Sequence, residues 1–322
     1  MLEHGGKLLA AAARYGIDAA DWLDLSTGIN PAGWPVPAVP PEVWQRLPET
    51  EDGLLDAAAA YYGCSSVLPV AGSQAAIQAL PRLRAACRVG VPHPAYAEHA
   101  HAWRAAGHAV VAWDAAMGVD ALDVLVLVHP NNPSGQTFSR TKLLDWHAEL
   151  AARGGWLVVD EAFIDATPHD SLADVCPRPG LIVLRSLGKF FGLAGARVGF
   201  VLADPALLAA LNTLLGPWAV SAPSCWVARA ALADSAWQQA ARPALLAAGA
   251  RLAALLRDHG LPPSGGTALF QWVRTPDAAA WHERLARQGV LTRLFAAPPS
   301  LRFGLPHHET DWARLAAALK SV

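Results

Sequence analysis

One lysine of this chain lies in a setting that suits covalent chemistry. Lys189 comes three residues after Ser186 and eight before Arg197, with glycines and alanines among the residues between them. A lysine amine forms a Schiff base with an aldehyde, while a hydroxyl and a guanidinium can hold a phosphate that glycines allow to approach closely. The stretch therefore predicts a site for pyridoxal phosphate (PLP), with Ser186 and Arg197 on the cofactor phosphate.

Asp160 follows an apolar run, residues 156–159, that predicts a buried strand. PLP chemistry needs a carboxylate that keeps the pyridine nitrogen protonated, so that the ring can accept electrons from the substrate Cα. An ordinary aspartate that caps a helix N-terminus is the alternative at such a position. Because Lys189 follows downstream, we favour the first interpretation and predict Asp160 and Lys189 as the catalytic residues.

Two further segments offer groups for the same cofactor. Asn132 lies in a turn-forming segment after an apolar run, and its amide could donate to the phenolic oxygen of PLP; a plain turn is the alternative. Gly72, Ser73 and Gln74 lie between a predicted strand and a predicted helix. The free N–H groups of a helix N-terminus suit a phosphate, so this turn is a candidate phosphate cradle.

Four more residues are candidates for the ring or the substrate. Tyr96 could stack on the pyridine ring or be a core tyrosine. Arg302 lies inside an apolar strand pattern, where burial is costly without an anion, and it suits a substrate α-carboxylate. Arg293 could lie on the surface or near the substrate. His4, beside Gly5 near the terminus, is the weakest candidate on spacing alone.

The elements that must position these residues alternate along the chain. Short apolar runs that predict strands are separated by helical segments, which favours a largely parallel sheet covered on both faces. The predicted strands of this sheet are 68–71, 88–91, 109–113, 124–128, 156–159 and 181–184. The predicted helices are 54–62, 205–215, 310–319 and most of 226–259, with Pro243 ending or kinking the last.

We therefore expect an α/β fold with a large domain of mostly parallel sheet between helices and a smaller α+β C-terminal domain. Strands predicted at 269–273 and 300–303 belong to the smaller domain. The expected boundaries are an N-terminal arm over 1–41 that contributes to the active site, a PLP-binding domain over 42–215 and a small domain over 216–322.

Composition excludes several classes of protein. The 322 residues are 53% hydrophobic, yet no apolar run approaches the roughly 18 residues that a membrane helix needs. The short apolar run 8–13 predicts a helical turn rather than a signal peptide. A net charge of −2 without a basic block argues against nucleic acid as a partner.

Scattered cysteines predict reduced thiols in a cytoplasmic protein, and no metal site is expected. The cysteines are Cys64, Cys87, Cys176 and Cys225.

Together these motifs resemble the fold-type I PLP-dependent aminotransferase family over nearly the whole chain. The matching segments are 72–74, 132–135, 160–163 and 186–197. The resemblance implies that Lys189 carries the cofactor, that Asp160 pairs with the pyridinium and that Asn132 meets the phenolic oxygen. It also implies that Tyr96 stacks on the ring. The implied phosphate ligands are Ser73, Gln74, Ser186 and Arg197.

Within that family, N-terminal segments resemble the threonine-phosphate decarboxylases of cobalamin biosynthesis. These segments are 4–6, 26–31, 46–49 and 52–54. The resemblance implies decarboxylation of O-phospho-L-threonine in a homodimer with sites at the subunit interface. It implies that Arg302 takes the substrate carboxylate, with Asn132 also at the substrate. His4, Gly5 and Arg293 are implied near the substrate phosphate.

Two other functions remain open. Histidinol-phosphate aminotransferases share every cofactor residue, so the cofactor motifs cannot separate them from the decarboxylases. A binding or regulatory protein of the same fold without turnover is a possibility of another class. The intact Lys189, Asp160 and Arg302 argue against that third interpretation.

The chain departs from the family pattern at two positions. Many relatives have a tyrosine where Phe163 stands, and that tyrosine bonds the phenolic oxygen of PLP. Many relatives also have a tyrosine near the position of Leu47 that reaches the cofactor phosphate of the neighbouring subunit. Neither Phe163 nor Leu47 can make such a bond, so Asn132 is expected to meet the phenolic oxygen alone.

Overall fold

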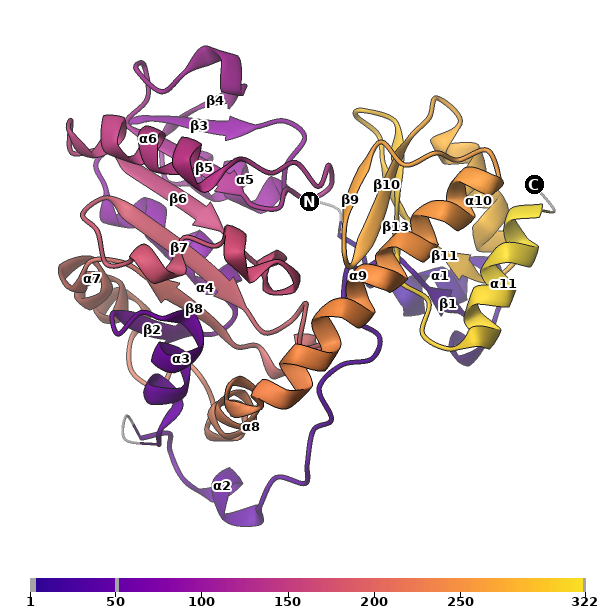
Figure 1. The fold of residues 1–322 in the computed structure, drawn as a ribbon, viewed down its shortest axis with the longest axis horizontal. Helices are drawn as coiled ribbons and strands as arrows, with labels where there is room; N and C mark the ends of the chain where they lie inside the picture. The colour runs from indigo at the N-terminus through magenta and orange to yellow at the C-terminus, as the bar shows by residue number, and fades with distance from the viewer. Residues whose placement is uncertain (1–3, 50–51, 321–322) are drawn as a thin grey trace.

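The computed structural model describes residues 4–49 and 52–320, which form a large lobe and a smaller C-terminal lobe (Figure 1). A seven-stranded sheet lies at the centre of the large lobe. Its order is β2 (Val67–Val70), β8 (Gly199–Leu202), β7 (Leu181–Ser186), β6 (Trp156–Asp160), β5 (Val124–Val128), β3 (Arg88–Pro92) and β4 (Ala109–Trp113). Within this sheet β8 alone runs against the other strands, which confirms the predicted, mostly parallel architecture.

Helices cover both faces of the sheet because successive residues of a strand point to opposite sides. Val124 and Val126 pack into a core on one face, whereas Leu125 and Leu127 pack into a core on the other. The helices on the first face are α4 (Ser73–Ala79), α5 (Ala97–Ala105) and α7 (Pro205–Leu215). The helices that contribute to the second core include α3 (Leu54–Tyr62) and α6 (Arg140–Ala151).

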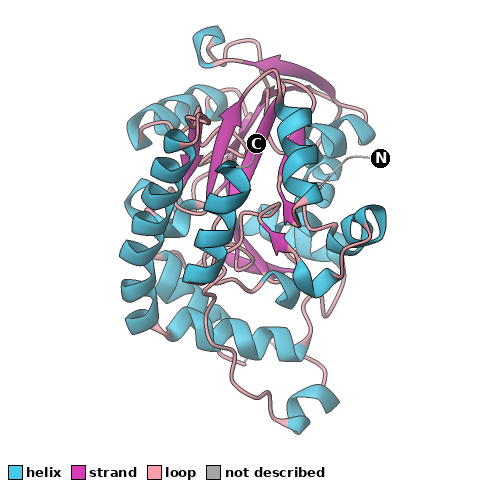
Figure 2. Cartoon of the chain, turned by 90° about the vertical axis from the view of Figure 1, so that its right-hand side faces the viewer, coloured by secondary structure: helices cyan, strands magenta, loops and turns pink. Residues whose placement is uncertain are grey.

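The smaller lobe is built on a four-stranded antiparallel sheet. Its order is β12 (Arg293–Phe295), β13 (Ser300–Gly304), β10 (Phe270–Arg274) and β9 (Gly265–Thr267). Its helices are α10 (Ala278–Arg287) and α11 (Glu309–Lys320). Figure 2, turned so that this side faces the viewer, shows helices lying around the strands.

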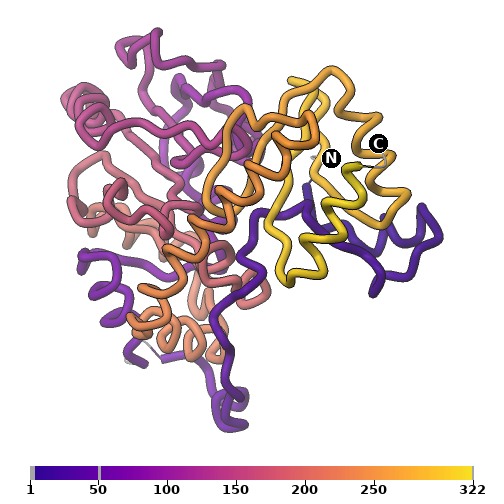
Figure 3. Tube along the Cα trace, turned by 45° about the vertical axis from the view of Figure 1, so that its right-hand side comes forward, coloured from indigo at the N-terminus to yellow at the C-terminus, as the bar shows by residue number. Residues whose placement is uncertain are grey.

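The N-terminal segment joins the C-terminal lobe rather than standing apart from it. Helix α1 (Leu8–Tyr15) packs on α10, and β1 (Leu23–Asp24) pairs in parallel with β11 (Val290–Leu291). The N-terminal segment therefore lies beside the C-terminal lobe, as the indigo and yellow segments show in Figure 3.

The predicted helix over 226–259 divides at a different place from the one expected. Helix α8 (Ala222–Ala233) stops before Asp234, and α9 (Ser235–Asp258) continues through Pro243. Of the two effects expected of Pro243, ending or kinking the helix, the first is wrong. The Asp234 carboxylate accepts a hydrogen bond from the backbone N–H of Trp237 at 3.0 Å, and this N-cap begins a new helix.

Helix α9 runs from the large lobe to the small one (Figure 1). Helix α8 packs on α3 of the large lobe. The boundaries of 1–41, 42–215 and 216–322 stay predictions.

A short helix, α2 (Pro41–Gln45), projects at the bottom of Figure 1. The single 3-10 turns are η1 (Ala19–Asp21), η2 (Leu80–Leu83), η3 (Ala115–Met117), η4 (Ile164–Ala166), η5 (Pro168–Asp170), η6 (Ala173–Val175) and η7 (Ala194–Ala196). Across the described ranges, no helix has both the length and the apolar character needed to cross a membrane.

Candidate active site

The loops that follow the parallel strands meet at one edge of the large sheet. Tyr96 follows β3, Asn132 follows β5, Asp160 ends β6 and Lys189 follows β7. Because parallel strands place their carboxyl ends at the same edge, four segments far apart in the sequence converge there. This is the place where sheets of this type bind their ligands.

Two adjoining cavities open at this edge and share Tyr96, Asn132 and Lys189 among their lining residues. The inner cavity, of about 130 Å³, is also lined by Ser73, Gln74, Asp160, Ser186 and Arg197. The outer cavity, of about 650 Å³, is also lined by His4, Gly5, Arg293 and Arg302. The structure thus brings together the candidates for the cofactor in one cavity and those for the substrate in the next.

Lys189 lies between the two cavities. Burial and the Arg302 and Arg197 guanidinium groups lower the pKa of its amine to about 8, although Asp160 acts in the opposite direction. A pKa near 8 leaves roughly a tenth of the amine neutral at pH 7, far more than for an ordinary lysine. The neutral amine is the form that attacks a carbonyl group, so the setting activates Lys189.

Asp160 is 3% exposed and is held by two donors. The His99 ring nitrogen Nε2 lies 2.9 Å from its Oδ2, and the Ala162 N–H donates to its Oδ1 at 3.1 Å. His99 lies in α5, three residues after Tyr96, and is buried. The sequence analysis missed His99 because only the packing of α5 on the sheet brings it to the end of β6.

The proposed phosphate cradle forms where Gly72 precedes α4. Gly72 has a φ of +70°, and a Cβ there would lie 2.7 Å from the Arg197 guanidinium. Only glycine suits this conformation and this close approach. Ser73 then begins α4 with backbone N–H groups that the helix leaves unpaired, and Ser186 ends β7 beside them in the inner cavity.

Arg302 and Asn132 are joined across the outer cavity. Arg302 Nη1 donates to Asn132 Oδ1 at 2.6 Å, and Nη2 donates to the Ser26 carbonyl at 2.9 Å. An arginine only donates, so Asn132 turns its oxygen toward Arg302 and keeps its NH₂ group as a donor. Burial and Arg293 lower the pKa of Arg302 to about 10, which still leaves the guanidinium charged at neutral pH.

One nitrogen of the Arg302 guanidinium group lacks a hydrogen-bond partner among the described residues. This atom, Nε, is buried. An unpaired buried donor on a cation is costly, which favours an anion close to the Arg302 guanidinium.

The N-terminal arm reaches the outer cavity. His4 Nε2 lies 2.7 Å from Glu98 Oε1, and Gly5 passes so close to the Ser26 carbonyl that a Cβ would lie 2.2 Å from it. Arg293 places its guanidinium 5.1 Å from the centre of the Phe295 ring. Neither His4 nor Gly5 could have been placed at this cavity by pattern alone, since the pairing of β1 with β11 brings the arm there.

Phe163 and Leu47, the two residues that depart from the family pattern, lie in different surroundings. Phe163 is buried, its ring packs edge-on against Phe270 at 5.1 Å, and it offers no hydroxyl to a cofactor. The Lys189 amine lies 5.6 Å from the centre of the Phe163 ring. Leu47 is 61% exposed, beyond the projecting α2.

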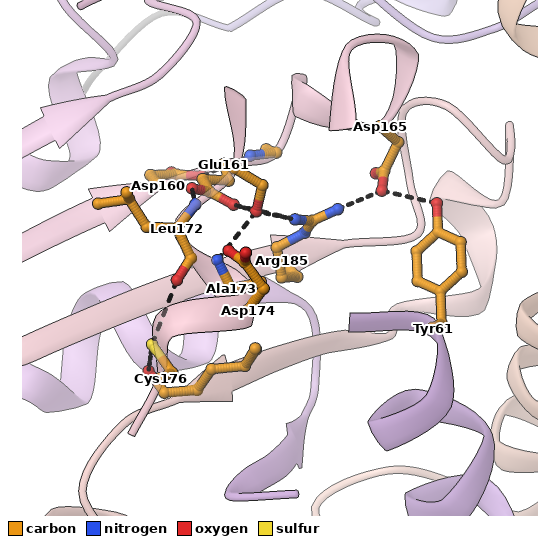
Figure 4. A network of polar contacts seen from close by, with 12 residues as sticks. Tyr61, Asp160, Glu161, Asp165, Leu172, Ala173, Asp174, Cys176 and Arg185 are labelled. Carbon is orange, nitrogen blue, oxygen red and sulfur yellow. Dashed lines mark hydrogen bonds and ion pairs between the residues drawn. The ribbon is translucent and has the colours of Figure 1, made fainter. Parts of the chain in front are cut away.

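A buried ionic network lies next to the end of β6 (Figure 4). Arg185 Nη1 lies 2.9 Å from Glu161 Oε2, and Nη2 contacts Asp165. The Tyr61 hydroxyl donates to Asp165 at 2.9 Å. Consecutive residues of an extended chain point to opposite sides, so Asp160 faces the site while Glu161 joins this network.

These groups fit PLP as a set. The inner cavity offers a lysine amine, a carboxylate, an amide donor, a phenol ring and a phosphate cradle with an arginine. The outer cavity adds Arg302, whose Nε–H is unpaired within the described residues. The chemistry of the donor set thus matches the parts of this cofactor.

The fold and the site define a class of enzyme, and comparison with known proteins agrees. Residues 21–319 match the family model "Aminotransferase class I and II", and the chain belongs to that family. This confirms the predicted fold class and the resemblance to it.

The most informative relatives come from two groups. The chain is 60% identical to a threonine-phosphate decarboxylase of Pseudomonas aeruginosa, over 99% of this chain and 97% of the relative. It is 46% identical to a threonine-phosphate decarboxylase of Sinorhizobium, over 98% and 97%. Mycobacterium tuberculosis has a histidinol-phosphate aminotransferase that is 35% identical over 88% of this chain and 83% of its own length.

Solved structures show the same fold at low identity. A histidinol-phosphate aminotransferase from Sinorhizobium meliloti in complex with pyridoxal-5'-phosphate superposes with a TM-score of 0.84 at 21% identity, covering 100% of this chain and 99% of its own. An L-threonine-O-3-phosphate decarboxylase from Porphyromonas gingivalis gives 0.79 at 19% identity, covering 92% and 98%.

Proposed function

We propose that the protein is a PLP-dependent lyase that decarboxylates O-phospho-L-threonine to (R)-1-aminopropan-2-ol phosphate for cobalamin biosynthesis. The observation that carries the proposal is the outer cavity, which has cationic groups for two anions. Arg302, with its unpaired N–H, suits the α-carboxylate, whereas His4 and Arg293 suit the phosphate. The two decarboxylase relatives support the same reaction.

Each residue near the cofactor has a defined task in this proposal. Lys189 holds the cofactor, and its amine returns a proton to the substrate Cα after carbon dioxide leaves. Asp160, oriented by His99, holds a proton on the pyridine nitrogen. Asn132 donates to the phenolic oxygen, and Tyr96 covers the ring. When bound, PLP accepts the electron pair released from a bond to Cα.

The choice of reaction rests on orientation. With PLP bound, the bond to Cα that would break is the one perpendicular to the ring, because its electrons could enter the π system. Arg302 at one end of the substrate and the phosphate-binding groups at the other fix the rotation about Cα. We propose that this grip turns the carboxylate, rather than the hydrogen, into the perpendicular position.

We expect unphosphorylated L-threonine to be a far poorer substrate than phosphothreonine. A charge-assisted hydrogen bond contributes about 1.5–3 kcal/mol, so losing the contacts of His4 and Arg293 together reduces kcat/KM on the order of a hundredfold or more. The release of CO₂ from both compounds measures the ratio.

Histidinol phosphate separates this function from the aminotransferase alternative. It carries a phosphate but no α-carboxylate, and so leaves Arg302 without its anion. Rapid amino transfer from histidinol phosphate to 2-oxoglutarate, with no CO₂ from phosphothreonine, would overturn the decarboxylase proposal.

We further propose that the protein is a cytoplasmic homodimer that binds small molecules, not nucleic acid or membranes. Three large apolar side chains lie exposed within residues 36–47, the segment that contains the projecting α2, and we propose that a second copy covers them. They are Val36, Trp44 and Leu47, at 54%, 67% and 61% exposure. We expect light scattering of the active protein to give twice the mass of one chain. The mass of a single chain at micromolar concentration would contradict the dimer.

A further inference from the structure

One acidic side chain lies close to residues that line the two cavities. Glu98, in the first turn of α5, is 14% exposed at its side chain. It lines neither the inner nor the outer cavity. A carboxylate near a site for a phosphorylated substrate repels that substrate unless other groups neutralise it. The contacts of Glu98 show what neutralises it.

Glu98 uses its two oxygens for two different parts of the chain. Oε2 accepts a hydrogen bond from Gln74 Nε2 at 2.9 Å, and Oε1 lies 2.7 Å from His4 Nε2. Gln74 belongs to the phosphate cradle, and its Oε1 accepts from the Tyr96 hydroxyl at 3.2 Å. A continuous polar chain therefore runs from Tyr96 through Gln74 and Glu98 to His4.

The arm has few other contacts at this end. The Gly6 N–H donates to Ser26 Oγ at 2.8 Å, and the next side-chain hydrogen bonds lie at the end of α1, where Arg14 and the Tyr15 hydroxyl donate to Glu283 at 3.2 and 2.6 Å. Lys7, between these contacts, is exposed. The hydrogen bond to Glu98 ties the His4 side chain to the large lobe, where the His4 ring also lies 6.0 Å from the Tyr96 ring.

The chemistry of the contact also fixes which nitrogen of His4 faces the cavity. An ionised carboxylate only accepts, so Nε2 carries the proton that points to Glu98. Nδ1 is then the ring nitrogen left for a ligand in the outer cavity. When His4 is doubly protonated, Nδ1 donates to a phosphate while Glu98 balances the charge of the ring.

We propose that Glu98 is a positioning residue that ties the N-terminal arm to the cofactor cradle and holds His4 at the outer cavity. It acts through His4 and does not touch the substrate. The structural part of this inference stands on the contacts alone. The kinetic part rests on the proposed function, because it takes the ligand of His4 to be the substrate phosphate.

Limited trypsin digestion of the holoenzyme tests the structural part. Cleavage after Lys7 requires the arm to open, so its rate reports how firmly the arm is held. We expect Glu98→Gln to speed cleavage after Lys7 about fivefold. A glutamine side chain has one acceptor oxygen, so it cannot accept hydrogen bonds from both His4 and Gln74. His4→Ala gives a similar increase without touching the folded body. Glu149→Gln, at an exposed position of α6, is the matched control and leaves the rate unchanged.

A double-mutant cycle tests the kinetic part. We expect Glu98→Gln to raise KM for phosphothreonine about tenfold with little change in kcat, and to change KM for L-threonine less than about twofold. In a His4→Ala background the same substitution has little further effect, because its partner is gone.

The outcomes separate the two proposals. Trypsin rates that match the wild type in both variants, or effects on KM that multiply independently, would overturn the role of Glu98. Faster cleavage in both variants, combined with no CO₂ from phosphothreonine in the wild type, supports the tie of the arm and refutes the proposed function alone.

Discussion

Lys189→Ala is expected to abolish the visible absorbance band of the bound cofactor and to lower turnover on the order of a thousandfold or more. The chain has four lysines, and Lys189 is the one that lines the two cavities. The others are exposed at Lys7, Lys142 and Lys320. No other lysine is therefore placed, in the structure as described, to replace the lost amine.

Absorbance, mass spectrometry after borohydride reduction and CO₂ release check this expectation. The control is Lys142→Ala on α6, where the amine lies 5.1 Å from the centre of the Trp146 ring and lines neither cavity. The control should keep both the absorbance band and turnover. A Lys189→Ala protein that kept them would show that another group holds the cofactor.

Arg185→Met is expected to destabilise the fold by about 3–5 kcal/mol. The guanidinium pairs with Glu161 and Asp165, which are 0% and 1% exposed. Methionine fills similar space but leaves two buried carboxylates without a cation. Such a loss is large because each carboxylate has already given up its contact with water.

Urea unfolding, carried out with the same excess of PLP for every variant, measures the lost free energy of unfolding. Arg287→Met is the matched control, because Arg287 forms an exposed pair with Glu283 at 2.8 Å and its loss should cost less than about 1 kcal/mol. Equal unfolding free energies for Arg185→Met and the control would show that the buried network does not hold ionised carboxylates.

The loss of stability caused by Arg185→Met should be larger at higher pH. Burial raises the pKa of Glu161, and Arg185 counteracts that rise. Without Arg185 the pKa in the folded state moves further above its value in the unfolded chain, so folding takes up protons. The stability of the variant then falls as pH rises, and its deficit against the wild type is larger at mildly alkaline than at mildly acidic pH.

The sequence by itself determined much of the fold and the reaction class. The helices over 54–62 and 205–215 and the strands over 109–113 and 124–128 lie as predicted. Apolar runs, glycines that end helices and prolines that begin them are local signals of a few residues, so they can be recognised in the sequence alone. Lys189 was found from its spacing to Ser186 and Arg197, and Asp160 from its place at the end of a predicted buried strand.

Only the tertiary structure decided which groups support those residues. His99 meets Asp160 across 61 positions, and His4 meets Glu98 across 94. The break at Asp234 instead of Pro243 likewise depends on packing, since Trp34 Nε1 also donates to the Asp234 carboxylate at 3.0 Å. No local pattern contains these pairs. Their partners are chosen when α5 packs on the sheet and the N-terminal segment pairs with β11, because a side chain's contacts across the fold follow from the arrangement of whole elements.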